Sequence, residues 1–101
     1  MIVYNITMKV NREIEKDWIR WQKEEHIVEI MRTGSFSEYK FFRLLDHEDE
    51  EGVTYVIQYF APSIEKYNEY IEKHAPLLQK KAIDKWKDQF ISFRTTMEAV
   101  Q

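Results

Sequence analysis

Apolar and polar side chains alternate along residues 2–10, and this period of two is the pattern of a strand with one buried face. Residues 36–46 and 53–60 show a similar alternation and are rich in aromatic and β-branched side chains, so we expect two further strands there. A fourth strand is predicted for residues 89–98. The short connection at 46–52 predicts that the second and third strands form an antiparallel hairpin.

A long helix is predicted between the first two strands, and its apolar stripe changes phase part of the way along. Ile14, Trp18 and Trp21 share one face by the i, i+4, i+7 rule. After His26 the apolar side chains move around the helix axis, so we expect a bend or a change of packing partner there. Gly34 is expected to end the helix, because glycine readily takes the left-handed conformation of a helix C-cap.

The second helix is predicted to begin at Pro62, because proline is well tolerated at the first helical position. Its apolar stripe runs through residues 64–82, and Pro76 lies inside it. A proline at an interior position removes a backbone hydrogen bond. We therefore expect a kink or a restart of the helix near His74.

The resulting order, βαββαβ, is that of a ferredoxin-like α+β fold. It predicts one domain over residues 1–101, with a four-stranded antiparallel sheet and two helices on one of its faces. In the second and third strands both alternating sets are apolar or aromatic, so the second sheet face would expose more apolar surface than soluble monomers usually do. A homodimer through this face, as in the dimeric α/β-barrel proteins, would cover it. A monomer whose tail folds under the sheet is the alternative.

Composition narrows the possible functions. The chain has no cysteine, which excludes disulfides, thiolate nucleophiles and zinc knuckles. A net charge of −3 without a basic excess argues against nucleic-acid binding. The N-terminus lacks the pattern of a signal peptide, and no apolar run approaches the roughly 18 residues of a membrane span. We expect a soluble, cytoplasmic protein that binds neither nucleic acid nor membrane.

Familiar metal and cofactor motifs are missing from the sequence. The acidic run at 46–51 lacks the spacing and the glycine position of a calcium-binding EF-hand, so a solvated turn is expected. No pair of histidines at i, i+4, P-loop, nucleophile elbow or dinucleotide fingerprint is present. Neither a metal ion nor a cofactor is predicted.

Several blocks of the chain resemble a known family. They include Trp-Ile-Arg-Trp at 18–21, the segments 26–31 and 33–36, Tyr-Val-Ile-Gln-Tyr at 55–59 and Phe-Arg-Thr at 93–95. These blocks are similar to a bacterial family, best known from Bacteroidetes, of proteins about the length of this chain that is described only as a domain of unknown function. The resemblance spans nearly the whole chain. It implies a ferredoxin-like fold of the dimeric α/β-barrel type, and it supplies no catalytic assignment.

Four residues near the predicted first helix and first strand are candidates for a pocket. His26 is a candidate general base or ligand, because histidine changes its charge near neutral pH; a histidine hydrogen-bonded between helices is the alternative. Trp18, Trp21 and Tyr4 would shape a pocket between the first helix and the sheet. Large aromatic side chains more often fill a core, so a packed interior is the competing interpretation.

Three further candidates, Asn5, Gln58 and Arg94, are polar residues inside strand patterns. A polar side chain is costly to bury unless it is hydrogen-bonded, so these residues face water or line a shared cleft. Arg94 would hold an anionic ligand or form a salt bridge at the rim of the dimer, and the sequence leaves both open. In haem-degrading α/β-barrel proteins a histidine of the second helix binds iron, and an asparagine of the first strand assists. His74 and Asn5 have a limited resemblance to these two residues in their positions along the chain.

Two main functions are consistent with the sequence. The first is a small homodimer that binds a small molecule or a protein partner without demonstrated catalysis. The second is a cofactor-independent monooxygenase or isomerase of the dimeric α/β-barrel type, with His26 as acid or base. A purely structural interaction module is a third class. The enzyme interpretation requires an open pocket of roughly 300 Å³ or more that touches His26 and at least one of Asn5, Gln58 and Arg94.

Overall fold

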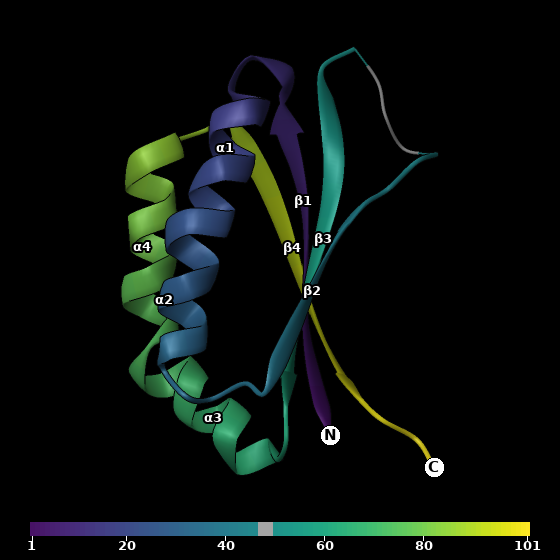
Figure 1. The fold of residues 1–101 in the computed structure, drawn as a ribbon, viewed down its shortest axis with the longest axis vertical. Coiled ribbons are helices and arrows are strands. Elements are labelled where there is room, and N and C mark those ends of the chain that lie inside the picture. The colour runs from purple at the N-terminus through teal and green to yellow at the C-terminus, as the bar shows by residue number, and fades with distance from the viewer. Residues whose placement is uncertain (47–49) are drawn as a thin grey trace.

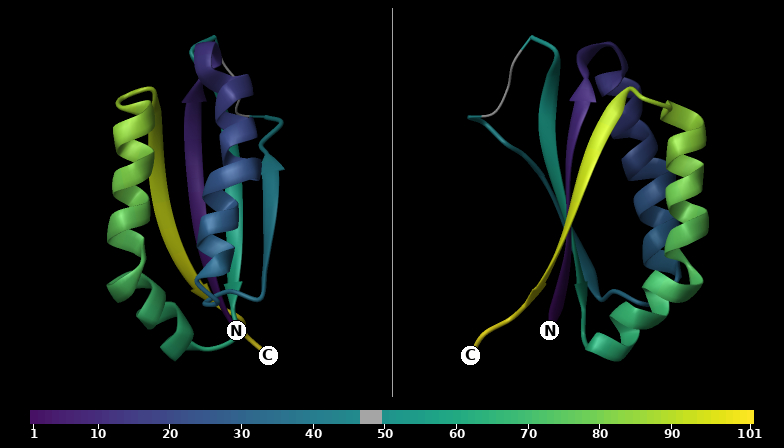
Figure 2. Two further views of the ribbon diagram at one scale, coloured as in Figure 1. Left: turned by 60° about the vertical axis from the view of Figure 1, so that its left-hand side comes forward. Right: turned by 180° about the vertical axis from the view of Figure 1, so that it is seen from behind.

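The protein consists of two layers, a twisted antiparallel sheet and a layer of helices (Figure 1). The computed structural model describes residues 1–46 and 50–101. In chain order the elements are β1 (Ile2–Asn11), the 3₁₀ turn η1 (Arg12–Ile14), α1 (Glu15–Trp21), the π-helical turn η2 (Gln22–His26), α2 (Ile27–Arg32), β2 (Glu38–Arg43), β3 (Gly52–Ala61), α3 (Ile64–Lys73), α4 (Ala75–Trp86) and β4 (Phe90–Glu98). Within the described residues, four strands form one sheet in the order β2-β3-β1-β4. Both helical segments lie on the same side of this sheet (Figure 2), which confirms the ferredoxin-like βαββαβ prediction.

The strand register decides which side chains face the helices. The central strand β1 pairs with β3 through Tyr4 and Tyr59, and with β4 through Ile6 and Arg94. Directly paired residues of an antiparallel sheet point to the same face. Tyr4, Tyr59 and Arg94 therefore share the face that the helices cover, whereas Asn5 points to the uncovered face.

The core between the two layers is rich in aromatic rings. Tyr4, which is buried, makes four ring contacts with centroid distances of 5.8–6.4 Å. Aromatic pairs at such distances stabilise a core beyond the area they bury. The other large aromatic side chains of the core are Trp18, Trp21, Phe36, Tyr55, Tyr59, Tyr70 and Trp86.

The predicted phase change of the first helix is a π-helical turn, η2. A π turn closes an i→i+5 hydrogen bond instead of i→i+4, so it holds an extra residue and rotates the following side chains about the helix axis. Trp18 and Trp21 are buried before this turn, and Ile27 and Ile30 are buried after it. The extra residue therefore keeps the apolar side of the helix on the sheet although the sequence period changes.

The start of the second helix differs from the prediction. Helix α3 begins at Ile64, and Ser63 is its N-cap residue. The Oγ atom of Ser63 accepts a hydrogen bond from the backbone N–H of Lys66. Serine is a strong N-cap because its oxygen satisfies an N–H that the first turn leaves free. Pro62 therefore precedes the cap, and the prediction that it begins the helix is wrong.

The predicted restart near His74 is confirmed. Helix α3 ends there, and α4 begins at Ala75 with Pro76 in its first turn, where the missing N–H costs no helical hydrogen bond. The predicted stripe was only partly right. Ile64 is 45% exposed, whereas Tyr70, which lies outside the stripe, is buried in the core.

Strand β2 is shorter than the predicted 36–46. Phe36 lies before it and is buried against Tyr59 and Tyr70. Strands β2 and β3 pair antiparallel, as predicted. The expected acidic turn at 46–51 falls largely on residues 47–49, which lie outside the described residues. None of the described helices is long and apolar enough to cross a membrane.

Replacing Gly34 with alanine should lower the free energy of unfolding by about 1–2 kcal/mol, because a Cβ disfavours left-handed backbone. Gly34 follows α2 with a φ of 76°, and its site has open space, so the cost comes from the backbone and not from a clash. Asparagine tolerates this conformation better, so Gly34→Asn should lose less. Urea unfolding measures both variants. Equal stability of the wild type and Gly34→Ala would contradict the prediction.

Candidate functional site

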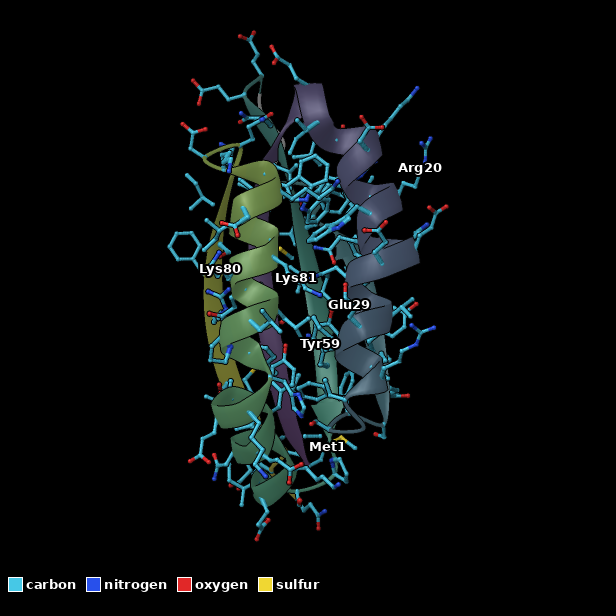
Figure 3. The ribbon with its side chains drawn as sticks, turned by 90° about the vertical axis from the view of Figure 1, so that its left-hand side faces the viewer. Met1, Arg20, Glu29, Tyr59, Lys80 and Lys81 are labelled. Atoms are coloured by element: carbon cyan, nitrogen blue, oxygen red, sulfur yellow. The ribbon has the colours of Figure 1, made fainter. Side chains whose placement is uncertain are left out.

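A cavity of about 120 Å³ lies between the helix layer and the helix-covered face of the sheet. Strands β1, β3 and β4 form one wall, and the segment α1–η2–α2 together with α3 and α4 forms the other. Figure 3 looks at this side of the molecule, with Tyr59 of β3 visible between the two helical segments. The polar lining of the cavity includes Tyr4, Gln22, His26, Tyr59, Tyr70 and Arg94.

The cavity meets only part of the requirement set for an enzyme site. It touches His26 and Arg94, as required, but its volume is well below the roughly 300 Å³ at which typical ligand pockets begin. Trp18 and Trp21 are buried beside it and fill part of the space. An apolar cavity of about 150 Å³ holds a benzene molecule, so this one suits a molecule with about one small ring.

Two polar residues of the π turn lie on the wall of the cavity. Gln22 is the first residue of η2 and His26 is the last. The imidazole of His26 stacks on the indole of Trp21 with a centroid distance of 4.4 Å and an interplanar angle of 17°. π-Helical turns are rare and frequently occur at functional sites. The local helix geometry thus brings a glutamine and a histidine to the same cavity.

Three buried polar atoms of the cavity lining have no hydrogen-bond partner among the described residues. They are Oε1 of Gln22, Nδ1 of His26 and the hydroxyl of Tyr59. A buried polar atom without a partner costs about 1–3 kcal/mol, and each such atom in a native structure needs an explanation. Ser35 Oγ and Trp86 Nε1 also lack a partner, but neither lines the cavity. The first three atoms all belong to residues that line it.

Arg94 adds a positive charge to the same cavity. Its Nε donates a hydrogen bond to the hydroxyl of Tyr4 at 3.0 Å. No ion pair of Arg94 occurs within residues 1–46 and 50–101. Because it lies on the helix-covered face, the structure does not place this side chain on the sheet face proposed for dimerisation.

The ionisation states of the lining favour binding over acid–base chemistry. The pKa of His26 is lowered to about 4, mainly by burial of the imidazole. The negative charge of Glu29 raises this pKa, and the positive charges of Lys81 and Arg94 lower it further. The imidazole is therefore neutral at pH 7 and is a weak base there. Burial also raises the pKa of Tyr4 and Tyr59, so both keep hydroxyl protons that can be donated to a ligand.

An ion pair joins the two helical segments near the cavity. Nζ of Lys81 on α4 lies 2.8 Å from a carboxylate oxygen of Glu29 on α2. Both side chains are partly exposed, and in Figure 3 they lie between the helices, near Tyr59. Neither residue lines the cavity, so the two opposite charges neutralise each other outside the site.

Two of the predicted candidates lie on the other side of the sheet. Asn5 and Gln58 are paired across β1 and β3, and Nε2 of Gln58 donates a hydrogen bond to Oδ1 of Asn5 at 3.2 Å. They point away from the helices and do not line the cavity. The hypothesis that Asn5, Gln58 and Arg94 line one shared cleft is therefore wrong, because Arg94 has the opposite parity in the sheet.

His74 does not join the site either. It lies at the junction of α3 and α4, where its ring is 6.2 Å from that of Tyr70. Asn5 faces the uncovered side of the sheet, so the structure does not assemble the histidine–asparagine pair of the haem-degrading proteins. Among the described residues, no group of three or more His, Cys, Asp or Glu side chains could hold a metal ion.

Sequence reasoning missed Gln22, Tyr59 and Tyr70 as lining residues. Tyr59 carried a usable signal, because it lies in the buried register of β3 and its hydroxyl needs a partner when buried. Gln22 is 2% exposed although glutamine is mostly a surface residue. Gln22 follows Trp18 by four residues, so the regular helical period could have placed it on the buried side of the helix.

Acidification should destabilise the protein through His26. The unfolded chain has a histidine pKa near 6.5, above the value of about 4 in the folded state, so the unfolded state binds the proton more tightly. The contribution of the neutral His26 to the free energy of unfolding should be fully present above pH 6.5. The free energy of unfolding should then fall by about 1–3 kcal/mol as the pH decreases to 4. Urea unfolding at a series of pH values measures this.

The His26→Asn variant removes the titrating group and should flatten the pH dependence between 6.5 and 4. His74→Asn removes a histidine outside the cavity and is the matched control. A slope that is unchanged in His26→Asn would show that His26 does not cause it.

Solved structures of other proteins share this arrangement of sheet and helices. A dimeric ferredoxin-like protein from an uncultured marine organism is similar with a TM-score of 0.71 and 11% identity, covering 99% of this chain and 95% of that one. A candidate antibiotic biosynthesis monooxygenase from Deinococcus radiodurans has a TM-score of 0.68 and 15% identity, covering 100% and 94%. SnoaB, a cofactor-independent oxygenase from Streptomyces nogalater, has a TM-score of 0.62 and 14% identity, covering 99% and 94%. Identities this low show a common fold alone.

No curated protein matches the sequence with statistical significance. A family model does match, and it spans residues 1–100, which includes every residue that lines the cavity. The sequence blocks that resembled a domain of unknown function lie inside this match. The chain therefore belongs to the family described as Domain of unknown function (DUF4286).

Proposed function

We propose that this protein is a homodimeric binding protein whose cavity takes up one small polar molecule per chain. One observation supports this most directly. Gln22, His26 and Tyr59, three residues that line the same cavity, each have a buried polar atom without a partner among the described residues. A bound molecule that offers hydrogen bonds to these atoms would offset the cost of burying them.

The same geometry supports binding better than catalysis. The cavity is small, and His26 is a poor base at neutral pH because its pKa is low. A cofactor-independent monooxygenase or isomerase is the alternative function. The fold shared with SnoaB and the location of His26 in the cavity support it, but a shared fold does not imply a shared reaction.

The uncovered face of the sheet is the proposed dimer interface. Large apolar side chains are exposed on it, including Phe93 at 67% and Ile91 at 60% on β4 and Phe42 at 46% on β2. Its centre is polar, because the hydrogen-bonded pair Asn5 and Gln58 lies there. The dimeric state of the marine ferredoxin-like protein further supports this part of the proposal.

The proposal also includes a cytoplasmic location and a bacterial, Bacteroidetes-type origin for this protein.

Phenol should bind in the cavity, because it combines a single ring with a hydroxyl that can both donate and accept a hydrogen bond. Nitrogen–proton correlation spectra, titrated with phenol, should show shifts at the side chain of Trp21 and at the backbone of Gln22 and His26. The Ala82→Leu variant adds bulk to the cavity wall and should weaken phenol binding by about tenfold.

The Ala99→Leu variant adds the same bulk outside the cavity and is the matched control. It should bind phenol as the wild type does. If phenol shifts no cavity signal at millimolar concentration, the binding function is wrong.

The purified protein should have a mass of about twice 12.4 kDa by light scattering coupled to size-exclusion chromatography. Phe93→Glu places a charge on the exposed sheet face and should shift the protein to monomer. Leu77→Glu changes an equally exposed apolar residue on the helix layer and should leave the dimer intact. A wild-type protein that is monomeric at high concentration would overturn the homodimer.

A further inference from the structure

We propose that the cavity selects a small organic monoanion. Its anionic group binds Arg94, and its body, about the size of one ring, occupies the interior of the cavity. This inference rests on the proposed binding function and adds the charge of the ligand to it.

Arg94 is the one charged side chain among the described residues that line the cavity. No carboxylate lines it, and the nearby Glu29 is paired with Lys81 at 2.8 Å. Glu29 and Lys81 cancel each other, so the cavity keeps one net positive charge. A cavity lined by one arginine, with no counter-charge from the described residues, favours an anion.

The guanidinium group has free donors for this purpose. Nε donates to the hydroxyl of Tyr4, which holds the group in place at the wall of the cavity. Nη1 and Nη2 make no hydrogen bond to any described residue. These two nitrogens form a planar fork that matches the two oxygens of a carboxylate. The hydrogen bond to buried Tyr4 thus orients an arginine that is itself exposed at the edge strand β4.

The rest of the lining defines the body of the ligand. Trp21, Ile30 and Leu78 offer apolar surface, and the volume of about 120 Å³ limits the enclosed part to about one ring. Because Arg94 is exposed, the anionic group lies at the mouth of the cavity and does not use this volume. The hydroxyl of Tyr59 and Oε1 of Gln22 remain for a polar substituent on the body. Carboxylates with a single ring fit this description.

Benzoate and benzamide are matched probes, because they have nearly the same shape and differ in charge. Titrations followed by nitrogen–proton correlation spectra should give a dissociation constant for benzoate that is about tenfold lower than that for benzamide. Arg94→Gln should remove this preference, so that its dissociation constants for benzoate and benzamide agree within about twofold. Arg94→Lys keeps the charge and should retain part of the preference, which tests the role of charge even if Arg94→Gln folds poorly.

Arg20→Gln is the matched control. Arg20 lies on α1 and points away from the molecule (Figure 3), so its loss changes the net charge by the same amount outside the cavity. This variant should keep the full preference for benzoate. Inorganic phosphate, which lacks the apolar body, should compete with benzoate only weakly.

The outcomes separate this inference from the function on which it rests. Equal binding of benzoate and benzamide, together with phenol binding in the cavity, overturns the anion selectivity and leaves the binding function standing. Phosphate that binds as tightly as benzoate overturns the organic body of the ligand. If none of phenol, benzoate and benzamide shifts the cavity signals, both proposals fail.

Discussion

The packing of the helix layer on the inward face of β1 is the interaction on which the rest of this structure depends. β1 is the strand that pairs with both β3 and β4, so its inward residues lie at the centre of the core. Tyr4 on this face contacts four aromatic rings. Large planar rings leave space where helix and strand side chains do not interdigitate, and here that space is a cavity bounded by hydroxyl groups. The core and the candidate site are therefore one region of the molecule.

Polar groups in this region cost stability. Gln22 and His26, the first and last residues of the π turn, lie in the wall of the cavity, where a continuous apolar stripe would place apolar side chains. The unpartnered atoms and the neutral histidine are both costs of burial. Places where a fold departs from its own local rules are frequently functional sites. Here two departures, the π turn and the unpartnered atoms, occur at residues that line one cavity.

The two faces of the sheet have different chemical characters. The inward face combines aromatic packing with the tyrosine hydroxyls and Arg94, and the outward face has exposed Phe42, Ile91 and Phe93 around the Asn5–Gln58 pair. The proposed ligand binding and the proposed self-association therefore use opposite faces of one sheet. The solved structures with this fold include a protein described as dimeric and another described as an oxygenase. The residues of the two faces, more than the shared fold, distinguish such proteins.

The sequence by itself determined the strands, the helices and the change of phase in the first helix, because each follows from periodicity within one segment. The alternation of residues 2–10 and the conformational freedom of Gly34 are local properties of this kind. Only the tertiary structure decided that Gln22, His26, Tyr59 and Arg94 line one cavity and that Asn5 and Gln58 do not. Strand register and the π turn make these decisions, and both depend on contacts between segments that are far apart in the chain. A shift of one residue in the pairing of β4 would move Arg94 to the opposite face, and a periodic pattern alone does not specify that shift.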